Sequence, residues 1–429
     1  MADKLQNYQL TIFTTLFIGY ACYAYNRKSV SLAMPQLMEE GLDKNQAGLI
    51  ISSQNVAYAI SKFLGGVLSD RISAKLLFSS GLVGCGLVTL IFASCSSVEV
   101  FALLWFLNGF AQGCGWPACS KILRQWFSPT QFGTWWSVLS ASANISGGIS
   151  PFLSAFLIIN YGWRFSLIIA GTVSVALGIV ASLVLVNSPT DVGLQSFSTK
   201  PPDAKKGEKS ASDGSVADLL RCPSLWLVSF CYMVVFCAKT STVDWGQLYL
   251  LEDRKHTQYV ASAFTSSVES GGFLGGILAG YLTDWALRNR TASADKERGN
   301  PRMPMAAYFM ISVLCCLHLL QFYVSESSSK LWISTIGFVL GAGFYGPIAI
   351  YGVVASESAP DHLSGTSHAV VALAANIGAI ISGLPFSYIA KYYSWSAIFF
   401  ILEVTTVINL LIMFLCRNMN YNMAKTKAE

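Results

Sequence analysis

Charged residues are scarce in this chain of 429 residues. Only 12% of its residues are charged, 53% are hydrophobic, and the mean hydropathy is +0.51. Soluble globular proteins carry about 25% charged residues. The shortage of charge therefore excludes an ordinary soluble domain and indicates an integral membrane protein.

Sequence signals for metal binding, for nucleotide binding and for a cleavable signal peptide are missing as well. The 11 cysteines show no CxxC or Cys/His spacing and fall mostly inside apolar runs, so we interpret them as small buried hydrophobic residues. The lack of a GxxxxGK[ST] loop argues against an ATP-driven pump. The start, MADKLQNYQ, is polar, and the apolar stretch after it is too long for a signal peptide. We expect no metal, no cofactor and no nucleic-acid partner.

Long apolar windows are what the sequence has in abundance. Windows of about 20 apolar residues are long enough to cross a bilayer. They predict twelve transmembrane helices, at 9–37, 45–69, 76–97, 99–124, 130–159, 164–187, 223–251, 257–286, 303–324, 331–356, 363–390 and 395–416. Residues 188–222 are polar and rich in Pro, Ser and Lys, as in a linker. We therefore expect an all-α membrane protein with three parts: an N-terminal six-helix bundle (1–187), a cytoplasmic linker (188–222) and a C-terminal six-helix bundle with a cytoplasmic tail (223–429).

The two halves of the sequence resemble each other. GTWWSVLSASANISGGIS (133–150) and GTSHAVVALAANIGAIIS (365–382) match at an offset of 232 residues, which also aligns Trp163 with Trp395. GVLSD (66–70) is echoed by GYLTD (280–284). A parallel repeat of six helices is typical of transporters built from two bundles.

The distribution of Lys and Arg predicts the orientation in the membrane. With both termini in the cytoplasm, 18 basic residues fall on the cytoplasmic side and 6 on the opposite side. Basic residues favour the cytoplasmic side of membrane proteins. We therefore expect both termini to be cytoplasmic. The sequon at Asn289 then lies on the cytoplasmic side, and the one at Asn144 lies within a helix, so we expect no N-glycosylation.

Several charges remain inside the predicted helices, where each costs roughly 2.5–3.5 kcal/mol on insertion scales and is paired or functional. The basic ones are Arg27, Lys28, Lys62 and Lys239; the acidic ones are Asp244, Glu269 and Glu403. Pairing alone does not account for all of these charges. Successive helical residues such as Arg27 and Lys28 point about 100° apart, so the two cations cannot face the same partner. Lys239 and Asp244 are about 140° apart by the same measure and do not satisfy each other.

We therefore predict two environments for these charges. Lys28 is expected to face the interface between the bundles and to pair with Asp244 and Glu269. Arg27, Lys62 and Lys239 are expected to face a central water-filled cavity at the midplane, without a protein counter-ion. A cluster of about three positive charges would bind a multiply charged anion, and Arg matches phosphate oxygens with two parallel hydrogen bonds.

Aromatic and polar neighbours are expected to line the same cavity: Tyr23, Tyr58, Asn55 and Asn144. For Asn144, which repeats as Asn376, close packing and ligand contact remain equal alternatives. His368 opens the eleventh predicted helix where the repeat has Trp136. We include it in the cavity, although a lone helical histidine is more commonly a structural residue.

These residues lie in motifs that resemble a known family. NRKSVSLAMP, AYAISKF, GVLSDR and VDWG resemble the organophosphate:phosphate antiporters of the major facilitator superfamily, over essentially the whole chain. YNRK, LWFLNGFAQGCGWP, FGTWW, GTSHAVVALAAN and LPFSYIAKYYSW are similar to members that exchange glucose 6-phosphate in the vertebrate endoplasmic reticulum. The resemblance implies antiport of glucose 6-phosphate into the lumen against inorganic phosphate, by alternating access in the lipid bilayer. It is compatible with functional coupling to a lumenal phosphatase.

The resemblance also implies roles for single residues. Arg27 and Lys239 would hold the phosphoryl group, one from each bundle; bacterial relatives tend to have Arg at the second position. Relatives with a histidine before the fifth-helix Asn differ from this chain, which has Ala143, so His368 would take that role. The loop motif residues Asp70, Arg71 and Asp284 would latch the cytoplasmic face. Lys425 and Lys427, in the ending KTKAE, resemble a dilysine signal for retrieval to the endoplasmic reticulum.

Other functions remain open at this point. The cations recognise phosphate but not the attached group, so an exchanger of glycerol 3-phosphate or phosphoenolpyruvate fits as well. A sensor that binds the sugar phosphate without moving it also fits. An intramembrane phosphatase lacks a nucleophile–base pair in this sequence, and a proton-coupled sugar carrier would need a free carboxylate in the cavity. We therefore expect a transporter rather than an enzyme.

Overall fold

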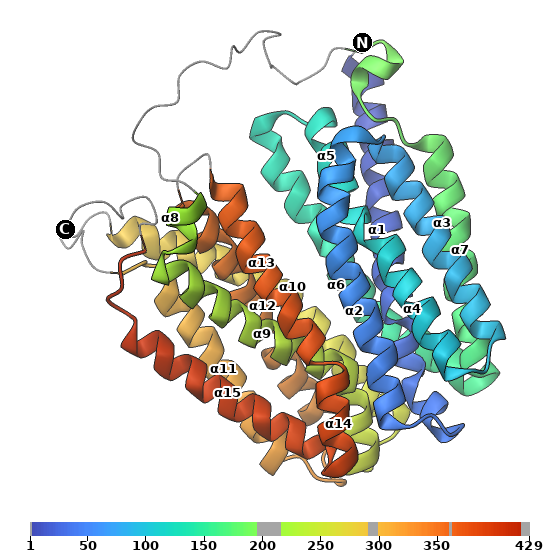
Figure 1. The fold of residues 1–429 in the computed structure, drawn as a ribbon, viewed down its shortest axis with the longest axis vertical. Coiled ribbons are helices and arrows are strands. Elements are labelled where there is room, and N and C mark those ends of the chain that lie inside the picture. Colours follow the sequence, from blue (N-terminus) through green and yellow to red (C-terminus); the bar gives the residue numbers. More distant parts are fainter. Residues whose placement is uncertain (1, 195–215, 291–298, 360–362, 422–429) are drawn as a thin grey trace. The chain divides into compact units, whose positions relative to one another are not determined.

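The computed structural model describes residues 2–194, 216–290, 299–359 and 363–421, and within these ranges all regular structure is helical. Figure 1 shows the helices coloured along the chain. The chain divides into two compact units, residues 1–206 and 207–429.

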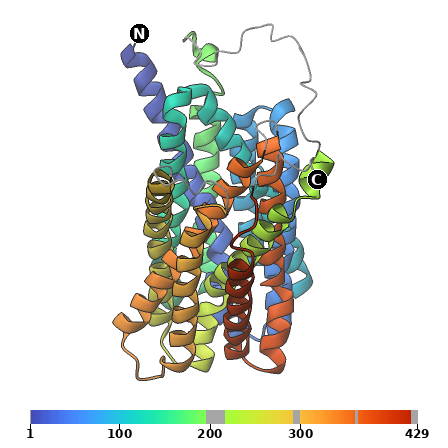
Figure 2. The same ribbon diagram turned by 90° about the vertical axis from the view of Figure 1, so that its left-hand side faces the viewer.

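The first unit holds six long helical segments, which run side by side in Figure 1; Figure 2 shows the same ribbon turned by 90°. Its elements are α1 (Ala2–Glu39), α2 (Lys44–Arg71), α3 (Ala74–Ser94), α4 (Val98–Gly113), α5 (Gly115–Trp126), α6 (Pro129–Tyr161), α7 (Trp163–Val184) and the 3₁₀ helix η1 (Pro189–Val192). Only Cys114 separates α4 from α5, so the two form one span. Gly162, with φ of 84°, makes the sharp turn from α6 into α7.

The second unit repeats this organisation. Its elements are α8 (Val216–Leu220), α9 (Pro223–Leu248), the π-helix η2 (Tyr249–Asp253), α10 (Gln258–Arg290), α11 (Met303–Phe322), α12 (Lys330–Ser358), α13 (Ser364–Ile381), α14 (Leu384–Tyr392) and α15 (Trp395–Leu415). The π-helix prolongs α9, and α14 prolongs α13 after a break at Ser382 and Gly383. Each of the twelve predicted spans is therefore helical, and the predicted fold class is confirmed. Short helices, η1 and α8, lie at the two ends of the expected linker.

The same helices pack together in both units. In the first unit α2 packs on α4, α3 on α7 and α1 on α6; in the second, α10 packs on α12, α11 on α15 and α9 on α13. Counted within each unit, these are the second span on the fourth, the third on the sixth and the first on the fifth. The repeat seen in the sequence is thus a repeat of packing.

Two glycines show how closely this repeat is kept. A Cβ added to Gly109 in α4 would overlap the backbone oxygen of Gln54 in α2. A Cβ added to Gly341 in α12 would overlap the backbone oxygen of Val268 in α10. The two contacts are related by the offsets of 232 and 214 residues found in the sequence. Only glycine permits this backbone approach, as in many membrane helix pairs.

A second repeated contact joins the first and last spans of each unit. The indole N–H of Trp163 donates to Glu40 Oε1 at 2.8 Å. The indole N–H of Trp395 donates to Glu252 Oε2 at 2.8 Å. We call these two contacts the indole–carboxylate pairs. They tie the end of α1 to the start of α7, and the end of η2 to the start of α15.

Polarity is not evenly spread over the spans. Among the described residues, nine helical spans are long and apolar enough to cross a membrane, and α1, α2 and α10 are not among them. These three helices carry Arg27 and Lys28, Lys62, and Glu269 respectively. The most polar spans are thus those with most of the intramembrane charge.

Candidate functional site

Arg27 lies in α1 and is surrounded by neutral polar and aromatic groups. Its Nε donates to Gln112 Oε1 in α4 at 3.0 Å. Its guanidinium carbon lies 4.2 Å from the centre of the Tyr58 ring in α2. Lys62 Nζ lies 5.8 Å from the centre of the same ring. The structure therefore brings Arg27, Lys62 and Tyr58 together within the first unit; that they line a substrate cavity stays a prediction.

Carboxylates do not take part in this cluster. Within the described part of the chain, no contact of Arg27 is with an acidic side chain. A guanidinium against an amide oxygen and an aromatic ring keeps its full positive charge. The first unit thus offers the kind of uncompensated cation that an anionic ligand needs.

Lys239 has a different environment, and here one prediction was wrong. Lys239 Nζ lies 3.9 Å from Glu269 Oε1 within the second unit. The Tyr345 hydroxyl donates to the other oxygen, Glu269 Oε2, at 2.5 Å. We expected Lys239 to lack a protein counter-ion, and this ion pair contradicts that expectation; the expected pairing of Glu269 with Lys28 stays a prediction. Because α10 packs against α9, the Glu269 carboxylate faces the lysine of α9 in its own unit.

The Lys239 ammonium also lies over two aromatic rings. It is 5.1 Å from the centre of the Tyr345 ring and 5.8 Å from that of Phe236. A 3.9 Å ion pair is at the outer limit of direct contact, so a closer anion would compete with Glu269 for this ammonium. Lys28 is half-buried on α1, and Asp244 is buried on α9. Their pairing with each other stays a prediction.

Tyr23 does not line a cavity beside Arg27, contrary to our prediction. Its side chain is fully buried in the core of the first unit. Its hydroxyl donates to the backbone oxygen of Phe78 in α3 at 2.6 Å, and its ring meets the Phe78 ring edge-on. Tyr23 lies one turn before Arg27, but it points to α3, so it packs the helix rather than contacting a ligand.

The remaining candidates lie on the expected helices. Asn55 and Asn144 are half-buried on α2 and α6. His368 is exposed near the start of α13, and its Nδ1 lies 3.3 Å from the backbone oxygen of Gly352. Their contact with a ligand stays a prediction.

Other candidates fall outside what the structure describes. Asp70 and Arg71 lie in α2 and Asp284 lies in α10, but their side chains are outside the described part. Lys425 and Lys427 lie beyond residue 421, the last described residue. The proposed cytoplasmic latch and retrieval signal therefore stay predictions.

Sequence reasoning missed the polar residues that support Arg27. Asn26, Gln54, Asn108 and Gln112 are buried in the first unit and hydrogen-bonded to one another. A signal was present, because Asn108 and Gln112 are four residues apart in an apolar span and so share one helix face. Uncharged amides inside membrane helices are a weaker sequence signal of function than charged residues are.

The indole–carboxylate pairs relate Arg27 to Lys239. Arg27 lies 13 residues before Glu40, and Lys239 lies 13 residues before Glu252. Because Trp163 and Trp395 are themselves repeat-related, the two cations occupy corresponding positions in the two units. Arg27 and Lys239 were predicted from their charge inside apolar helices, without this equivalence.

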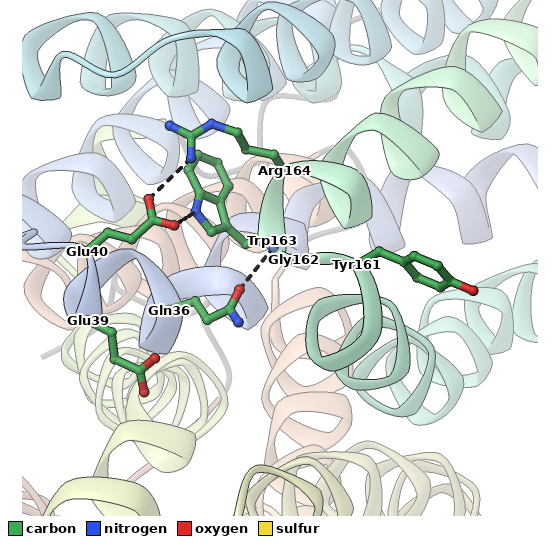
Figure 3. A pocket seen from close by; sticks show the side chains of 7 residues that line it. All are labelled: Gln36, Glu39, Glu40, Tyr161, Gly162, Trp163 and Arg164. Carbon is green, nitrogen blue, oxygen red and sulfur yellow. Dashed lines mark hydrogen bonds and ion pairs between the residues drawn. The ribbon is translucent and has the colours of Figure 1, made fainter.

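A cavity of about 390 Å³ opens at the far end of α1 (Figure 3). Its lining residues are Gln36, Glu39, Glu40, Tyr161, Gly162, Trp163 and Arg164. Arg164 pairs with Glu40 at 3.2 Å, and the Trp163 backbone N–H donates to Gln36 Oε1 at 3.0 Å. With two carboxylates and one cation, this cavity would repel a phosphate, so it is not the predicted site.

Comparison with known proteins identifies the family. The model of the Major Facilitator Superfamily matches residues 16–383. A probable hexose phosphate transport protein of Chlamydia pneumoniae is 32% identical over 443 aligned positions, which cover 99% of this chain and 94% of the relative. The membrane sensor protein UhpC of Escherichia coli K12 is 29% identical over 94% of this chain and 90% of the relative.

A solved structure shares the fold. It is a bacterial homologue of the human lysosomal transporter Spinster in an inward-facing, occupied conformation. The TM-score is 0.76 at 12% identity, with 98% of this chain and 99% of that chain covered. At this identity the likeness concerns the fold alone.

Proposed function

Because the chain belongs to the Major Facilitator Superfamily, we propose that it exchanges an organophosphate for inorganic phosphate across a membrane. The observation that carries the proposal is the equivalence of Arg27 and Lys239, two intramembrane cations 13 residues before the two indole–carboxylate pairs. The family and the relatives are membrane proteins of the transport class, in agreement with the expectation that the chain is not an enzyme.

Sugar phosphates are the substrate class we propose. A relative with 32% identity over nearly the whole chain is named a probable hexose phosphate transport protein. Arg27 and Lys62, with Tyr58 between them, would bind phosphoryl oxygens from the first unit, and Lys239 would bind them from the second. Glucose 6-phosphate, entering the lumen of the endoplasmic reticulum as phosphate leaves, is the specific pair we propose.

Exchange rather than leak is expected from the charges. Cations brought close together without a ligand repel each other strongly when water is excluded. A doubly charged phosphoryl group cancels this repulsion, so the loaded carrier changes conformation more easily than the empty one. Each turnover then carries one phosphate compound in each direction.

The test is counterflow in proteoliposomes. Vesicles are preloaded with labelled inorganic phosphate, and efflux is measured with and without external glucose 6-phosphate. We expect external sugar phosphate or phosphate to accelerate efflux at least ~10-fold, whereas glucose does not. Equal efflux in all conditions would contradict an exchanger. Competition by glycerol 3-phosphate and phosphoenolpyruvate in the same assay decides between the substrates.

A sensor is the second candidate, because one relative is named a membrane sensor protein. A sensor would bind the sugar phosphate without catalysing counterflow. Thermal stabilisation of the purified protein by glucose 6-phosphate, together with absent counterflow, would favour the sensor over the exchanger.

A further inference from the structure

A buried polar network in the first unit ends at Arg27. Its members come from five helices of the unit: Asn26 in α1, Gln54 in α2, Thr89 in α3, Asn108 and Gln112 in α4, and Ser174 in α7. All six side chains are buried and hydrogen-bonded.

The orientation of the amides in the network follows from Arg27. A guanidinium N–H only donates, so the Gln112 atom that faces Arg27 Nε must be the amide oxygen. The Gln112 Nε2 then donates to Asn108 Oδ1 at 2.7 Å. The Asn108 Nδ2 in turn donates to Asn26 Oδ1 at 2.8 Å and lies 3.1 Å from Thr89 Oγ1.

The far side of the network holds these amides in place. Asn26 Nδ2 donates to Ser174 Oγ at 3.1 Å, and Thr89 Oγ1 lies 3.1 Å from Asn26 Oδ1 and 2.8 Å from the backbone oxygen of Cys85. Gln54 Nε2 lies 3.2 Å from Asn108 Oδ1. The close approach of Gly109 to the Gln54 backbone fixes α2 against α4 at this level. Turning any one amide over would leave two donors or two acceptors facing each other in a buried place.

The chemical character of the network matters as much as its rigidity. All six members are neutral, so they orient the guanidinium without cancelling its charge. In the second unit the corresponding lysine is instead oriented by a carboxylate, Glu269. An isosteric Glu at position 112 would fit the same space but would form an ion pair with Arg27.

We infer that Gln112, held by Asn108 and Asn26, is a positioning residue that aims the Arg27 guanidinium at the substrate phosphoryl group while leaving its charge available. This inference rests on the proposed function. Asn108 and Asn26 act through Gln112 and are not expected to touch the substrate.

The experiment compares two substitutions at one position in the full-length protein. Gln112→Glu keeps the shape and adds a charge; Gln112→Leu removes the acceptor and leaves the Arg27 charge. Each purified variant is melted in detergent across a series of inorganic phosphate concentrations, and the KM for phosphate exchange is measured in proteoliposomes. Asn409→Asp, at a buried amide of α15 in the second unit, shows what a new buried carboxylate does by itself.

We expect Gln112→Glu to melt at or below the wild-type temperature without ligand, because its carboxylate pairs with Arg27 but has no N–H to donate to Asn108 Oδ1. Its apparent dissociation constant and its KM for phosphate should both rise at least ~10-fold. Gln112→Leu should raise KM ~3–10-fold, and Asn108→Leu should follow it. Asn409→Asp should keep the wild-type KM, whatever its melting temperature.

A merely structural network predicts the opposite result for KM. Lower melting temperatures and less active protein, with the KM for phosphate unchanged in Gln112→Glu, would overturn the inference. Should Gln112→Glu fail to fold, an unchanged KM in Gln112→Leu overturns it equally. If wild type exchanges phosphate in proteoliposomes and Arg27→Ala does not, the proposed function stands and these variants judge the inference alone. If wild type does not exchange phosphate, both fall.

Discussion

Arg27 and Lys239 occupy corresponding positions, yet the side chains around them differ in kind. Arg27 meets an amide and an aromatic ring. Lys239 meets a carboxylate that a tyrosine hydroxyl also holds. The first cation is thus permanently available, whereas the second must leave Glu269 or share it when an anion arrives.

Arg27→Ala should abolish phosphate exchange while the protein remains folded. The substitution removes the charge and the planar donors that phosphate needs, but Arg27 is only partly buried and packs no apolar core. Exchange should fall at least ~100-fold in proteoliposomes, with a monodisperse gel-filtration peak. Arg27→Lys is the control that retains charge, and it should keep some exchange. Normal exchange by Arg27→Ala would remove Arg27 from the site.

Lys239→Arg should impair exchange less than Lys239→Ala. Arginine keeps the positive charge opposite Glu269, whereas alanine leaves a buried carboxylate without its cation, at a cost of roughly 3–5 kcal/mol. Lys239→Ala should therefore lower both the melting temperature and the exchange rate. Lys239→Ala combined with Glu269→Gln should recover the melting temperature but not exchange. Recovery of both would assign Lys239 a structural role only.

At the scale of helices, the indole–carboxylate pairs fasten the two spans that begin and end each unit. Trp163→Phe keeps a smaller aromatic ring in the buried place and removes the hydrogen bond from the indole N–H to the half-exposed Glu40. Trp395→Phe removes the corresponding bond to Glu252. Both variants should melt at lower temperature and keep the wild-type KM for phosphate. A changed KM at an unchanged melting temperature would place these tryptophans near the substrate instead.

The packing of α2 on α4 and of α10 on α12 should respond to side-chain volume in the same way. At Gly109 and Gly341 even one methyl group meets a backbone oxygen of the facing helix. Gly341→Ala should therefore reduce the yield of folded protein, measured by fluorescence-detected gel filtration. Gly276→Ala in α10 is the matched control, because nothing lies within 4 Å of its added Cβ. Equal yields for both variants would show that these two helices adjust freely.

For the whole molecule, the sequence predicted the spans and much of the first unit's cluster. The bilayer thickness sets the length of each apolar window, so the twelve spans can be read directly from the sequence. Arg27 and Lys62 were found because a charge in an apolar helix is conspicuous. The Lys239–Glu269 pair was missed because partner choice depends on which helices pack together, which periodicity within one helix does not reveal. Tyr23 was misplaced for the same reason.

Topology offers a test at the same scale. With both termini in the cytoplasm, the sequon at Asn289 is out of reach of lumenal glycosylation. The protein from mammalian cells should therefore show no shift in gel mobility after glycosidase treatment. A sequon inserted between Tyr323 and Trp332, in the predicted lumenal loop, should become glycosylated. Modification of Asn289 itself would reverse the predicted orientation.

The unequal polarity of the spans has a consequence for biosynthesis. The first two helices to leave the ribosome, α1 and α2, carry Arg27, Lys28 and Lys62 within their predicted membrane spans. The translocon partitions each segment by its own hydrophobicity, so α1 and α2 would enter lipid poorly one at a time. We expect α1 and α2 to remain beside the translocon channel until α3 and α4, which supply their hydrogen-bonding partners, have been synthesised. Nascent chains stopped after α2 should remain extractable by carbonate, and chains stopped after α5 should not.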